Sequence, residues 1–247
     1  MTRAVYLVDP AVLAGAGPGT PVTLDGPEGR HAATVRRTRV GERVDLVDGE
    51  GTRARASVVA VGTGTLDLRV ESAVTEPEPS PRFVLVQALA KGDRDERAVE
   101  AATECGVDEV VPWQAARCVV QWRGERGERS WRRWDAVLVA ATKQSRRARR
   151  PVLGATASTE DLVARSAAAA ATLVLHEDAD APLATVDLPP EGDVLVVVGP
   201  EGGIAPEELD ALGAAGGTAV RLGPTVLRSS SAGPAALAVL SARDRWR

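Results

Sequence analysis

The stretch VLVVVGPEGGIAPEEL, residues 194–209, decides the fold of this chain. Five apolar residues run directly into a Gly-Pro-Glu-Gly-Gly turn, and an acidic segment that begins at Pro206 follows. A buried strand, a turn and a helix in succession are typical of a parallel sheet covered by helices. Glycines at a strand end let the backbone approach a ligand closely, although a tight turn before a helix explains this loop alone equally well. The stretch predicts an α/β domain and raises the question of which ligand the turn would bind.

The composition restricts the class of protein. The chain has 247 residues, of which 44% are hydrophobic and only 3% aromatic, so alanine, valine and leucine must fill a sizeable core. The formal net charge of −4 excludes a uniformly basic nucleic-acid-binding protein. Any contact with nucleic acid therefore needs a local basic patch.

The cysteine and histidine content argues against a metal site. The two cysteines, Cys105 and Cys118, form no CxxC pair, and only His31 and His176 could add imidazole ligands. Two isolated thiols fit a reducing cytoplasm. The N-terminus does not have the pattern of a signal peptide, and the longest small-apolar run, residues 167–175, is too short to span a membrane. We expect a cytoplasmic protein with no metal and no membrane contact.

The segment TEPEPSPR, residues 75–82, separates two kinds of sequence. Its three prolines favour extended backbone outside a sheet. Residues 1–72 contain short alternating strands punctuated by glycine, which predicts a small β-rich barrel, and residues 73–82 form a linker. In residues 83–247 strands alternate with helices. We expect strands at 83–89, 107–113, 171–177, 193–199 and 219–223, and helices at 93–106, 129–145, 206–217 and 231–243.

A second glycine loop, LGPTVLRSSSAGPAALAVL at residues 222–240, repeats the arrangement of the first. The chain has no Walker A motif, and the GPEGG turn lacks the spacing of a dinucleotide-binding fingerprint. Both loops follow strands that we expect to be adjacent, and a third strand end, LVLHE at residues 173–177, precedes them. Because open α/β sheets bind ligands at the carboxyl ends of their strands, the three loops together predict a pocket lined by backbone.

These three loops together resemble the knot loops of the SPOUT methyltransferases, and in particular those of the RsmE family. Three more stretches resemble that family: HAATVRRTRVGERVDLVDGEG (31–51), ALAKGDRDERAVEAATECGVDEVVP (88–112) and AATKQSRRARRP (140–151). The resemblance covers nearly the whole chain. It implies a PUA-like, RNA-binding β-barrel at 1–72 and a SPOUT methyltransferase domain at 83–247, whose parallel sheet contains a deep trefoil knot.

The RsmE family methylates N3 of a uridine in small-subunit (16S) ribosomal RNA with S-adenosylmethionine. The resemblance therefore implies this cofactor and activity, ribosomal RNA or the small ribosomal subunit as partner, and a homodimer. It places the cofactor against the three loops, at Leu175, His176, Gly199, Glu201, Gly203, Ile204, Leu222, Gly223, Leu227 and Ser229.

Two side chains are candidates for the chemistry. The N3 atom of a uridine must lose its proton before it attacks a methyl group, and the negative charge then spreads onto the flanking carbonyl oxygens. Arg228 is expected to stabilise that charge, unless it forms a structural salt bridge instead. Glu201 could accept the proton, although it could equally cap the helix or bind ribose hydroxyls.

RNA contacts are expected where basic residues concentrate, because phosphate contacts offset the cost of moving a base out of its stack. Residues 117–150 hold eleven basic residues against three acidic ones. The tryptophans within this stretch, Trp122, Trp131 and Trp134, are better explained by helix packing. The expected RNA-binding residues come from the barrel, the KGDR segment and this stretch: Arg36, Arg37, Arg39, Lys91, Arg94, Gln144, Arg146, Arg147, Arg149 and Arg150.

Two positions depart from the family pattern. Ser229–Ser231 stand where Thr-Glu-Thr is common, and Lys143 stands where glutamate is usual. If the missing glutamate had an essential charge, serine could not supply it. Two alternatives therefore stay open: a SPOUT enzyme that methylates a ribose 2′-hydroxyl, and a non-catalytic RNA-binding factor of ribosome assembly.

Overall fold

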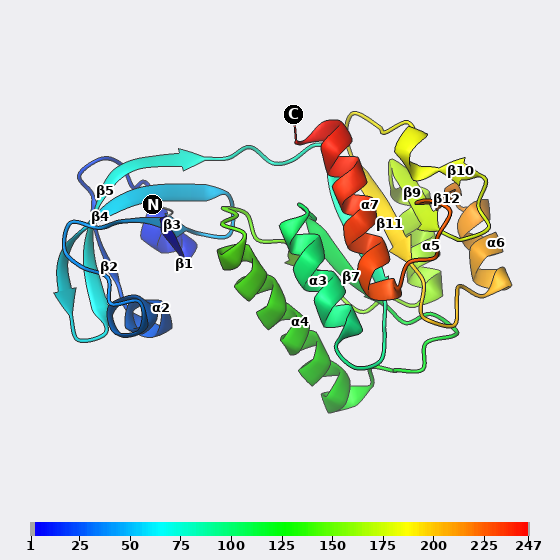
Figure 1. Ribbon diagram of the computed structural model, residues 1–247, viewed down its shortest axis with the longest axis horizontal. Helices are drawn as coiled ribbons and strands as arrows, with labels where there is room; N and C mark the ends of the chain where they lie inside the picture. Colours follow the sequence, from blue (N-terminus) through cyan, green and yellow to red (C-terminus); the bar gives the residue numbers. More distant parts are fainter. Residues whose placement is uncertain (1–2, 247) are drawn as a thin grey trace. The chain divides into compact units, whose positions relative to one another are not determined.

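The chain forms two compact units (Figure 1). A computed structural model describes residues 3–246. The first unit comprises the described residues up to Glu78 together with Thr142–Arg150, and the second comprises Pro79–Ala141 and the described residues from Pro151 onward. Within residues 3–246, no helix is both long enough and apolar enough to cross a membrane.

The first unit is built on a five-stranded sheet of order β1-β3-β4-β5-β2. The β1–β3 pair is parallel and the other three pairs are antiparallel. Short helices and a π-helical turn at His31–Val35 connect the strands. The elements are β1 Ala4–Leu7, α1 Pro10–Leu13, β2 Pro21–Leu24, α2 Gly26–Arg30, β3 Arg43–Val47, β4 Thr52–Gly62 and β5 Thr65–Thr75.

The alternation of apolar and polar residues explains why these strands form. In β5, Leu66, Leu68 and Val70 are at most 1% exposed, whereas the residues between them face solvent. Strands β4 and β5 meet at a turn where Gly64 has a φ of +76°, which glycine adopts without strain. The half-buried strands that the alternation predicts are confirmed.

The boundary between the units differs from the expected one in two ways. Strand β5 continues to Thr75, so the chain stays paired beyond residue 72, where the barrel was expected to end. Residues 142–150, expected in the second unit, belong to the first. There the backbone N–H of Arg150 donates to Gly49 O at 2.8 Å. Such a contact joins residues far apart in sequence, which helix and strand periodicity cannot reveal.

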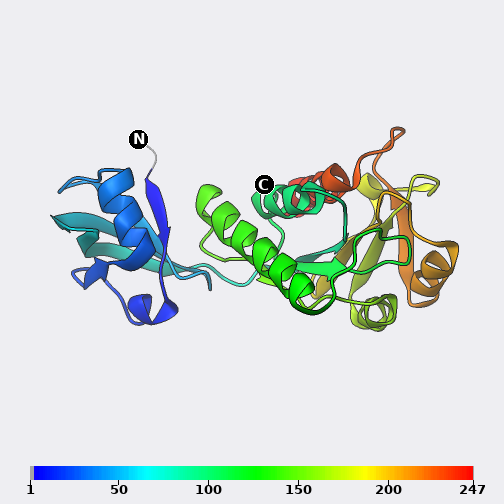
Figure 2. The same cartoon turned by 90° about the horizontal axis from the view of Figure 1, so that it is seen from below.

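The second unit is built on a seven-stranded parallel sheet of order β10-β12-β9-β11-β6-β7-β8. Its strands are β6 Arg82–Ala88, β7 Glu109–Trp113, β8 Val152–Leu153, β9 Ala171–Leu175, β10 Ala181–Pro182, β11 Asp193–Val198 and β12 Gly217–Arg221. Its helices are α3 Arg94–Glu104, α4 Gly124–Gln144, which ends within the first unit, α5 Thr159–Ala168, α6 Pro206–Ala214 and α7 Ser229–Asp244, with a 3₁₀ turn at Leu183–Thr185. Helices α3 and α7 lie on one face of the sheet and α5 on the other (Figure 2).

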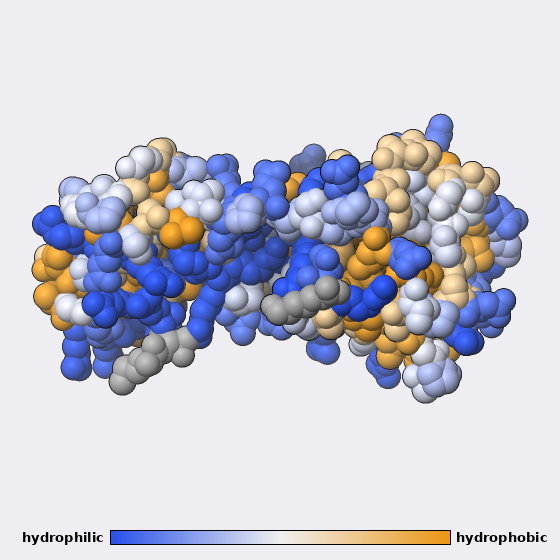
Figure 3. Space-filling model, turned by 90° about the horizontal axis from the view of Figure 1, so that it is seen from above, coloured by the Kyte–Doolittle hydropathy of each residue, from blue (hydrophilic) through white to orange (hydrophobic). Residues whose placement is uncertain are grey.

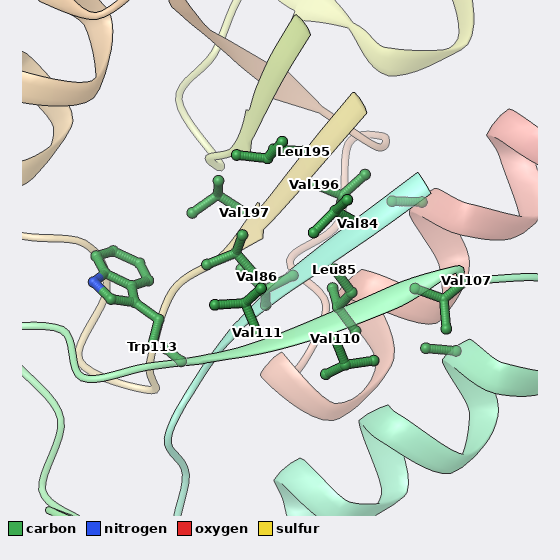
Figure 4. Close-up of a cluster of buried hydrophobic side chains, with 14 of the residues drawn as sticks. Val84, Leu85, Val86, Val107, Val110, Val111, Trp113, Leu195, Val196 and Val197 are labelled. Atoms are coloured by element: carbon green, nitrogen blue, oxygen red, sulfur yellow. The ribbon is translucent and has the colours of Figure 1, made fainter. Parts of the chain in front are cut away.

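The central strands are buried on both faces, which explains their continuous apolar runs. Residues 194–198 of β11 are at most 2% exposed. Figure 4 shows the side chains of Leu195, Val196 and Val197 in one cluster with those of β6 and β7. Gly233 lets α7 approach this sheet, because a Cβ there would lie 2.8 Å from Leu85 Cδ1.

All the expected strands and helices of this unit are present, with ends shifted by a few residues. Helix α5 and the short strands β8 and β10 were not predicted. Helix α5 carries a start signal, since Ser158 and Asp161 form a capping box. Its alanine-rich second half hides the apolar periodicity that identifies a helix.

The order of the strands corrects one expectation. Strand β9 pairs with both β11 and β12 and lies between them, so the strands that precede the two glycine loops are not adjacent, and the loops flank the end of β9. After β12 the chain returns through α7, which packs on α3 and β6. Near its end, Arg245 donates to the carbonyl oxygens of Pro81 and Gly106, each at 2.6 Å. This path is compatible with the trefoil knot, which stays a prediction.

Candidate active site

A cavity of about 440 Å³ opens at the carboxyl ends of β9 and β11. Its volume is typical of a small-molecule site. The end of β9, the GPEGG turn, the loop before α7, the first turn of α7 and the first residue of α3 form its walls. The lining residues are Arg94, Leu175, His176, Glu177, Val198, Gly199, Pro200, Glu201, Gly203, Ile204, Val226, Leu227, Arg228, Ser229 and Ala232.

A second, smaller cavity of about 100 Å³ shares the end of β9 and the Val226–Leu227 wall with the first. It also contacts Leu222 and Gly223. Every residue that was expected to bind the cofactor therefore lines one of these two cavities. The three loops predicted to form a pocket do come together.

The GPEGG turn is held by contacts within the chain. The backbone N–H of Gly203 donates to Pro200 O at 2.9 Å, and Arg117 donates to Gly202 O at 3.1 Å. Gly203 has a φ of +73°, where other residues are strained. At Gly199 a Cβ would lie 2.6 Å from Ile204 Cγ1. The glycine at 199 is thus needed for packing against Ile204, and not only for the approach of a ligand.

The carboxylate of Glu201 joins this turn to the segment before α3. Its Oε1 accepts from Arg94 Nη1 at 2.8 Å and from the backbone N–H of Lys91 at 3.3 Å. Burial raises the pKa of Glu201, but hydrogen bonds from its own backbone, from Arg94 and from Lys91 outweigh burial and leave the pKa below its ordinary value. A lowered pKa makes a carboxylate a weaker proton acceptor, so this geometry disfavours Glu201 as a general base.

The loop at 222–228 presents an open wall. Val226 is 77% exposed and Leu227 is 39% exposed. Within residues 3–246 the Arg228 guanidinium makes no hydrogen bond or ion pair, so the salt bridge that could have explained this residue is absent there. The Oγ atom of Ser229, the first residue of α7, is buried and has no hydrogen-bond partner in the described part of the chain. A buried hydroxyl of this kind costs about 1–3 kcal/mol, which a ligand with a polar group could recover.

Some residues that line the cavity were not predicted to lie there. Arg94 was expected to contact RNA, yet it lines the cavity because the β11–β6 pairing brings the start of α3 beside the turn. The other unpredicted lining residues are Glu177, Val198, Pro200, Val226 and Ala232. Their position within or beside the three loops was the only sequence signal available for them.

The residues expected to bind RNA differ in the solvent exposure of their side chains and in their contacts within the chain. Arg36, Arg37 and Arg39 of the first unit are exposed, as are Lys91 and Arg94 of the second and Gln144 and Arg146 of the 142–150 segment. Arg147 and Arg150 are half-buried. Arg149 is engaged, because it donates to Glu76 O at 2.8 Å and its guanidinium lies against Gly51. The concentrated RRARR sequence is therefore not a uniformly solvated patch.

Lys143 and the tryptophans have structural contacts. Lys143, which stands where glutamate is usual, donates to Glu28 at 2.6 Å within the first unit, so the reversed charge is paired. Trp134 is buried and meets Trp122 edge to face, with ring centroids 5.0 Å apart. Trp131 donates to Gly154 O at 2.9 Å. These contacts support the packing explanation.

Metal-ligating side chains do not gather in the described part of the chain. No group of three or more histidine, cysteine, aspartate or glutamate side chains there could hold a metal ion. Cys118 is buried and Cys105 half-buried, and both are free thiols. Burial raises the pKa of each thiol, which makes both poor nucleophiles.

Comparison with known protein families matches both units. Residues 76–241 match the model of an RNA methyltransferase domain, and residues 24–71 match that of an RNA methyltransferase PUA domain. The chain is 49% identical over 233 residues to a ribosomal RNA small subunit methyltransferase E from Mycobacterium bovis, covering 92% of this chain and 89% of the relative. It is 28% identical over 227 residues to the protein of the same name from Bacillus subtilis, covering 89% of each.

A solved structure has the same architecture. A ribosomal RNA small subunit methyltransferase E from Neisseria gonorrhoeae, bound to S-adenosylmethionine, superposes with a TM-score of 0.82 at 25% sequence identity, covering 98% of both chains.

Proposed function

Because this chain belongs to the ribosomal RNA small subunit methyltransferase E (RsmE) family, we propose that it methylates 16S ribosomal RNA with S-adenosylmethionine, at N3 of a uridine. The observation that carries this proposal is the 440 Å³ cavity, which combines a preformed glycine turn with an arginine that has no partner among residues 3–246. An unrelated nucleotide-binding fold is disfavoured, because the chain lacks a Walker A motif and a dinucleotide-binding fingerprint.

The cavity fits S-adenosylmethionine. Leu175, Ile204 and Leu227 offer apolar walls for an adenosyl group. The buried Oγ of Ser229 lacks a partner that a polar atom of the ligand could supply. Gly223 has no atom within 4 Å of the position of a Cβ, so its backbone is open to a ligand. The bound cofactor would supply a methyl group on a positively charged sulfur.

Arg228 has the properties that the chemistry requires. When N3 of the uridine loses its proton, negative charge develops on the neighbouring carbonyl oxygens, and an unpaired guanidinium can donate to them without first breaking another contact. The proton passes to water, since Glu201 is committed to Arg94. Orientation and electrostatics, rather than covalent catalysis, then supply most of the acceleration.

RNA contacts are proposed for the exposed arginines of the first unit, Arg36, Arg37 and Arg39. The π-helical turn at His31–Val35 leads into them, and Arg37 adopts a φ of +52°, a backbone conformation rare outside glycine. Arg146 and the flanking Gln144, Arg147 and Arg150 extend the proposed RNA-binding set, with Lys91 beside the cavity. Arg149 is assigned to the structure of the first unit because of its bond to Glu76 O.

A homodimer is part of the proposal, and α7 supports it. Its buried positions, Gly233, Pro234, Ala236, Leu237 and Leu240, pack inside the second unit, and the half-buried positions between them include Ala235, Ala238 and Val239. A helix that is apolar around its circumference is typically covered on all sides. Apolar residues also reach the surface of the second unit in the view of Figure 3. Sedimentation of a species of twice the 25.7 kDa chain mass is expected, and a monomer would contradict the dimer.

The test of the function is methyl transfer followed by nucleoside analysis. Small ribosomal subunits that lack the modification are incubated with the protein and labelled S-adenosylmethionine. We expect the label in 3-methyluridine, and labelling slower by roughly 100-fold or more with the R228A variant. Label in a 2′-O-methyl nucleoside would favour the ribose alternative, and no incorporation would favour a non-catalytic assembly factor. Since the proposed substrate is ribosomal RNA, we propose that the protein works in the cytoplasm.

A further inference from the structure

Two arginines reach the cavity from the starts of two packed helices. Arg94 is the first residue of α3, and Arg228 directly precedes α7. Helices α3 and α7 pack against each other, and both begin at the carboxyl edge of the sheet (Figure 1). The first turns of both helices add partial positive charge to that of the two guanidinium groups. The other charged or titratable side chains that line the cavity are His176, Glu177 and Glu201.

Arg94 keeps most of its hydrogen-bonding capacity. Its guanidinium has five N–H donors, and the described contacts use Nη1 alone, which donates to Glu201 at 2.8 Å. The Arg94 side chain is 46% exposed and that of Glu201 is 31% exposed, so the pair is accessible from the cavity. Glu201 also accepts from the backbone N–H of Lys91, and it therefore fixes the segment that carries Arg94.

The target base has a matching arrangement of acceptors. In uracil, N3 lies between two carbonyl groups, and loss of the N3 proton places negative charge on both oxygens. Two guanidinium groups that approach from different helices suit two such acceptors. Cytosine carries an amino donor in place of one carbonyl group, and this donor would face a guanidinium with no acceptor between them.

We propose that Arg94 is a specificity-determining residue that, with Arg228, binds the two carbonyl oxygens of the target uracil, while Glu201 positions Arg94. This inference rests on the proposed uridine-N3 activity. In the step, the N3–H bond breaks and its proton passes to water. The N3 electron pair then forms the N–C bond to the methyl group, and the pair of the breaking C–S bond stays on sulfur. Both arginines remain protonated throughout.

The experiment measures methylation by the wild type and by R94A, R94K and E201Q. Each enzyme receives small subunits with uridine or with cytidine at the target position. The matched control is R97A, because Arg97 also lies on α3 and pairs with Asp93 outside the cavity. Binding of S-adenosylhomocysteine is measured for each variant, so that a folding defect is separated from a defect in base recognition.

For R94A we expect kcat on uridine to fall by roughly 100-fold, with the Kd for S-adenosylhomocysteine unchanged within about twofold. The preference for uridine over cytidine should shrink, and the pH–rate profile should move to higher pH because the uracil anion is less stabilised. R94K should regain part of the rate. E201Q should lower kcat on uridine and the preference for uridine over cytidine, each by roughly 10-fold or less. R97A should match the wild type.

The outcomes separate this inference from the proposed function. If the wild type forms 3-methyluridine but R94A keeps the same rate, base preference and pH profile, the role of Arg94 is wrong and the function stands. If the wild type forms no 3-methyluridine, both proposals are wrong. If E201Q matches the wild type while R94A is impaired, Glu201 does not position Arg94.

Discussion

The two glycine loops of the cavity each follow a strand and contain a Gly-Pro pair, but their contacts differ. The GPEGG turn after β11 is bonded to its surroundings through Glu201 and Gly202, and the Gly203 N–H closes the turn on Pro200 O. The loop before α7 exposes Val226 and leaves Arg228 and the Oγ of Ser229 without partners among the described residues. One wall of the cavity is therefore preformed, whereas the other presents an exposed guanidinium and a buried hydroxyl that are available to a ligand. The difference teaches that glycine content alone does not distinguish a structural turn from a ligand-binding loop.

The largest expected effect comes from the open loop. Replacing Arg228 by alanine removes the proposed partner of the developing negative charge, and kcat should fall by roughly 100- to 1000-fold. Binding of S-adenosylhomocysteine, measured by calorimetry, should change by less than about twofold, since the charge arises only during the reaction. The R228K variant, which keeps a positive charge, should retain more activity. Full turnover by R228A would remove this residue from the mechanism.

The second effect should come from the preformed turn and should appear in binding rather than in turnover. In G199V the added side chain would collide with Ile204, and overpacking of this kind costs about 1–3 kcal/mol. Binding of S-adenosylmethionine should weaken by roughly 5- to 150-fold. Gly213 on α6 has no neighbour within 4 Å of a Cβ, so G213A should bind normally. Equal binding by both variants would show that the turn does not shape the site.

A smaller effect is expected from replacing Ser229 by alanine, which should raise the stability of the unliganded protein but weaken ligand binding. Because its buried Oγ lacks a partner, S229A should stabilise the unliganded protein by about 1 kcal/mol. The same change should weaken binding of S-adenosylhomocysteine by roughly fivefold, if the ligand supplies the missing partner. Thermal unfolding with and without the ligand measures both. S231A, at an exposed neighbouring position, should change neither. A loss of stability in the unliganded S229A protein would contradict the assignment.

The smallest effect concerns pH. The folded protein lowers the pKa of Glu201 below its unfolded value, so the carboxylate stabilises the fold above the ordinary glutamate pKa. This stabilisation is lost as the pH falls through the lowered value. E201Q should therefore be less stable than the wild type by about 0.5 kcal/mol at neutral pH, since the pair is partly exposed. The difference should vanish in acid. A difference that persists unchanged at low pH would contradict the ion pair as its cause.

Much of this molecule can be predicted from sequence because its signals are local. The apolar run of β11 and the apolar–polar alternation of β5 identify these segments as strands, and the glycine loops indicate the end of the sheet where the cavity opens. The family resemblance then named individual residues within 199–204 and 222–229, and the structure places all of them against the two cavities.

The rest depends on pairing between distant segments. The insertion of β9 between β11 and β12, the place of Arg94 beside Glu201 and the membership of residues 142–150 in the first unit all arise from such pairing. The bond of Arg149 to Glu76 O is another example, since a run of arginines does not show which of them is engaged.

Amide hydrogen exchange on the folded protein tests the central claim most directly. The claim is that the GPEGG turn is ordered before the methyl donor binds, whereas the loop before α7 becomes ordered on binding. Amides of residues 225–231 and of residues 199–204 are compared with and without S-adenosylhomocysteine. The account predicts a large gain of protection in 225–231 and a small one in 199–204. Equal gains in both segments, or no change in 225–231 at saturating ligand, would contradict it.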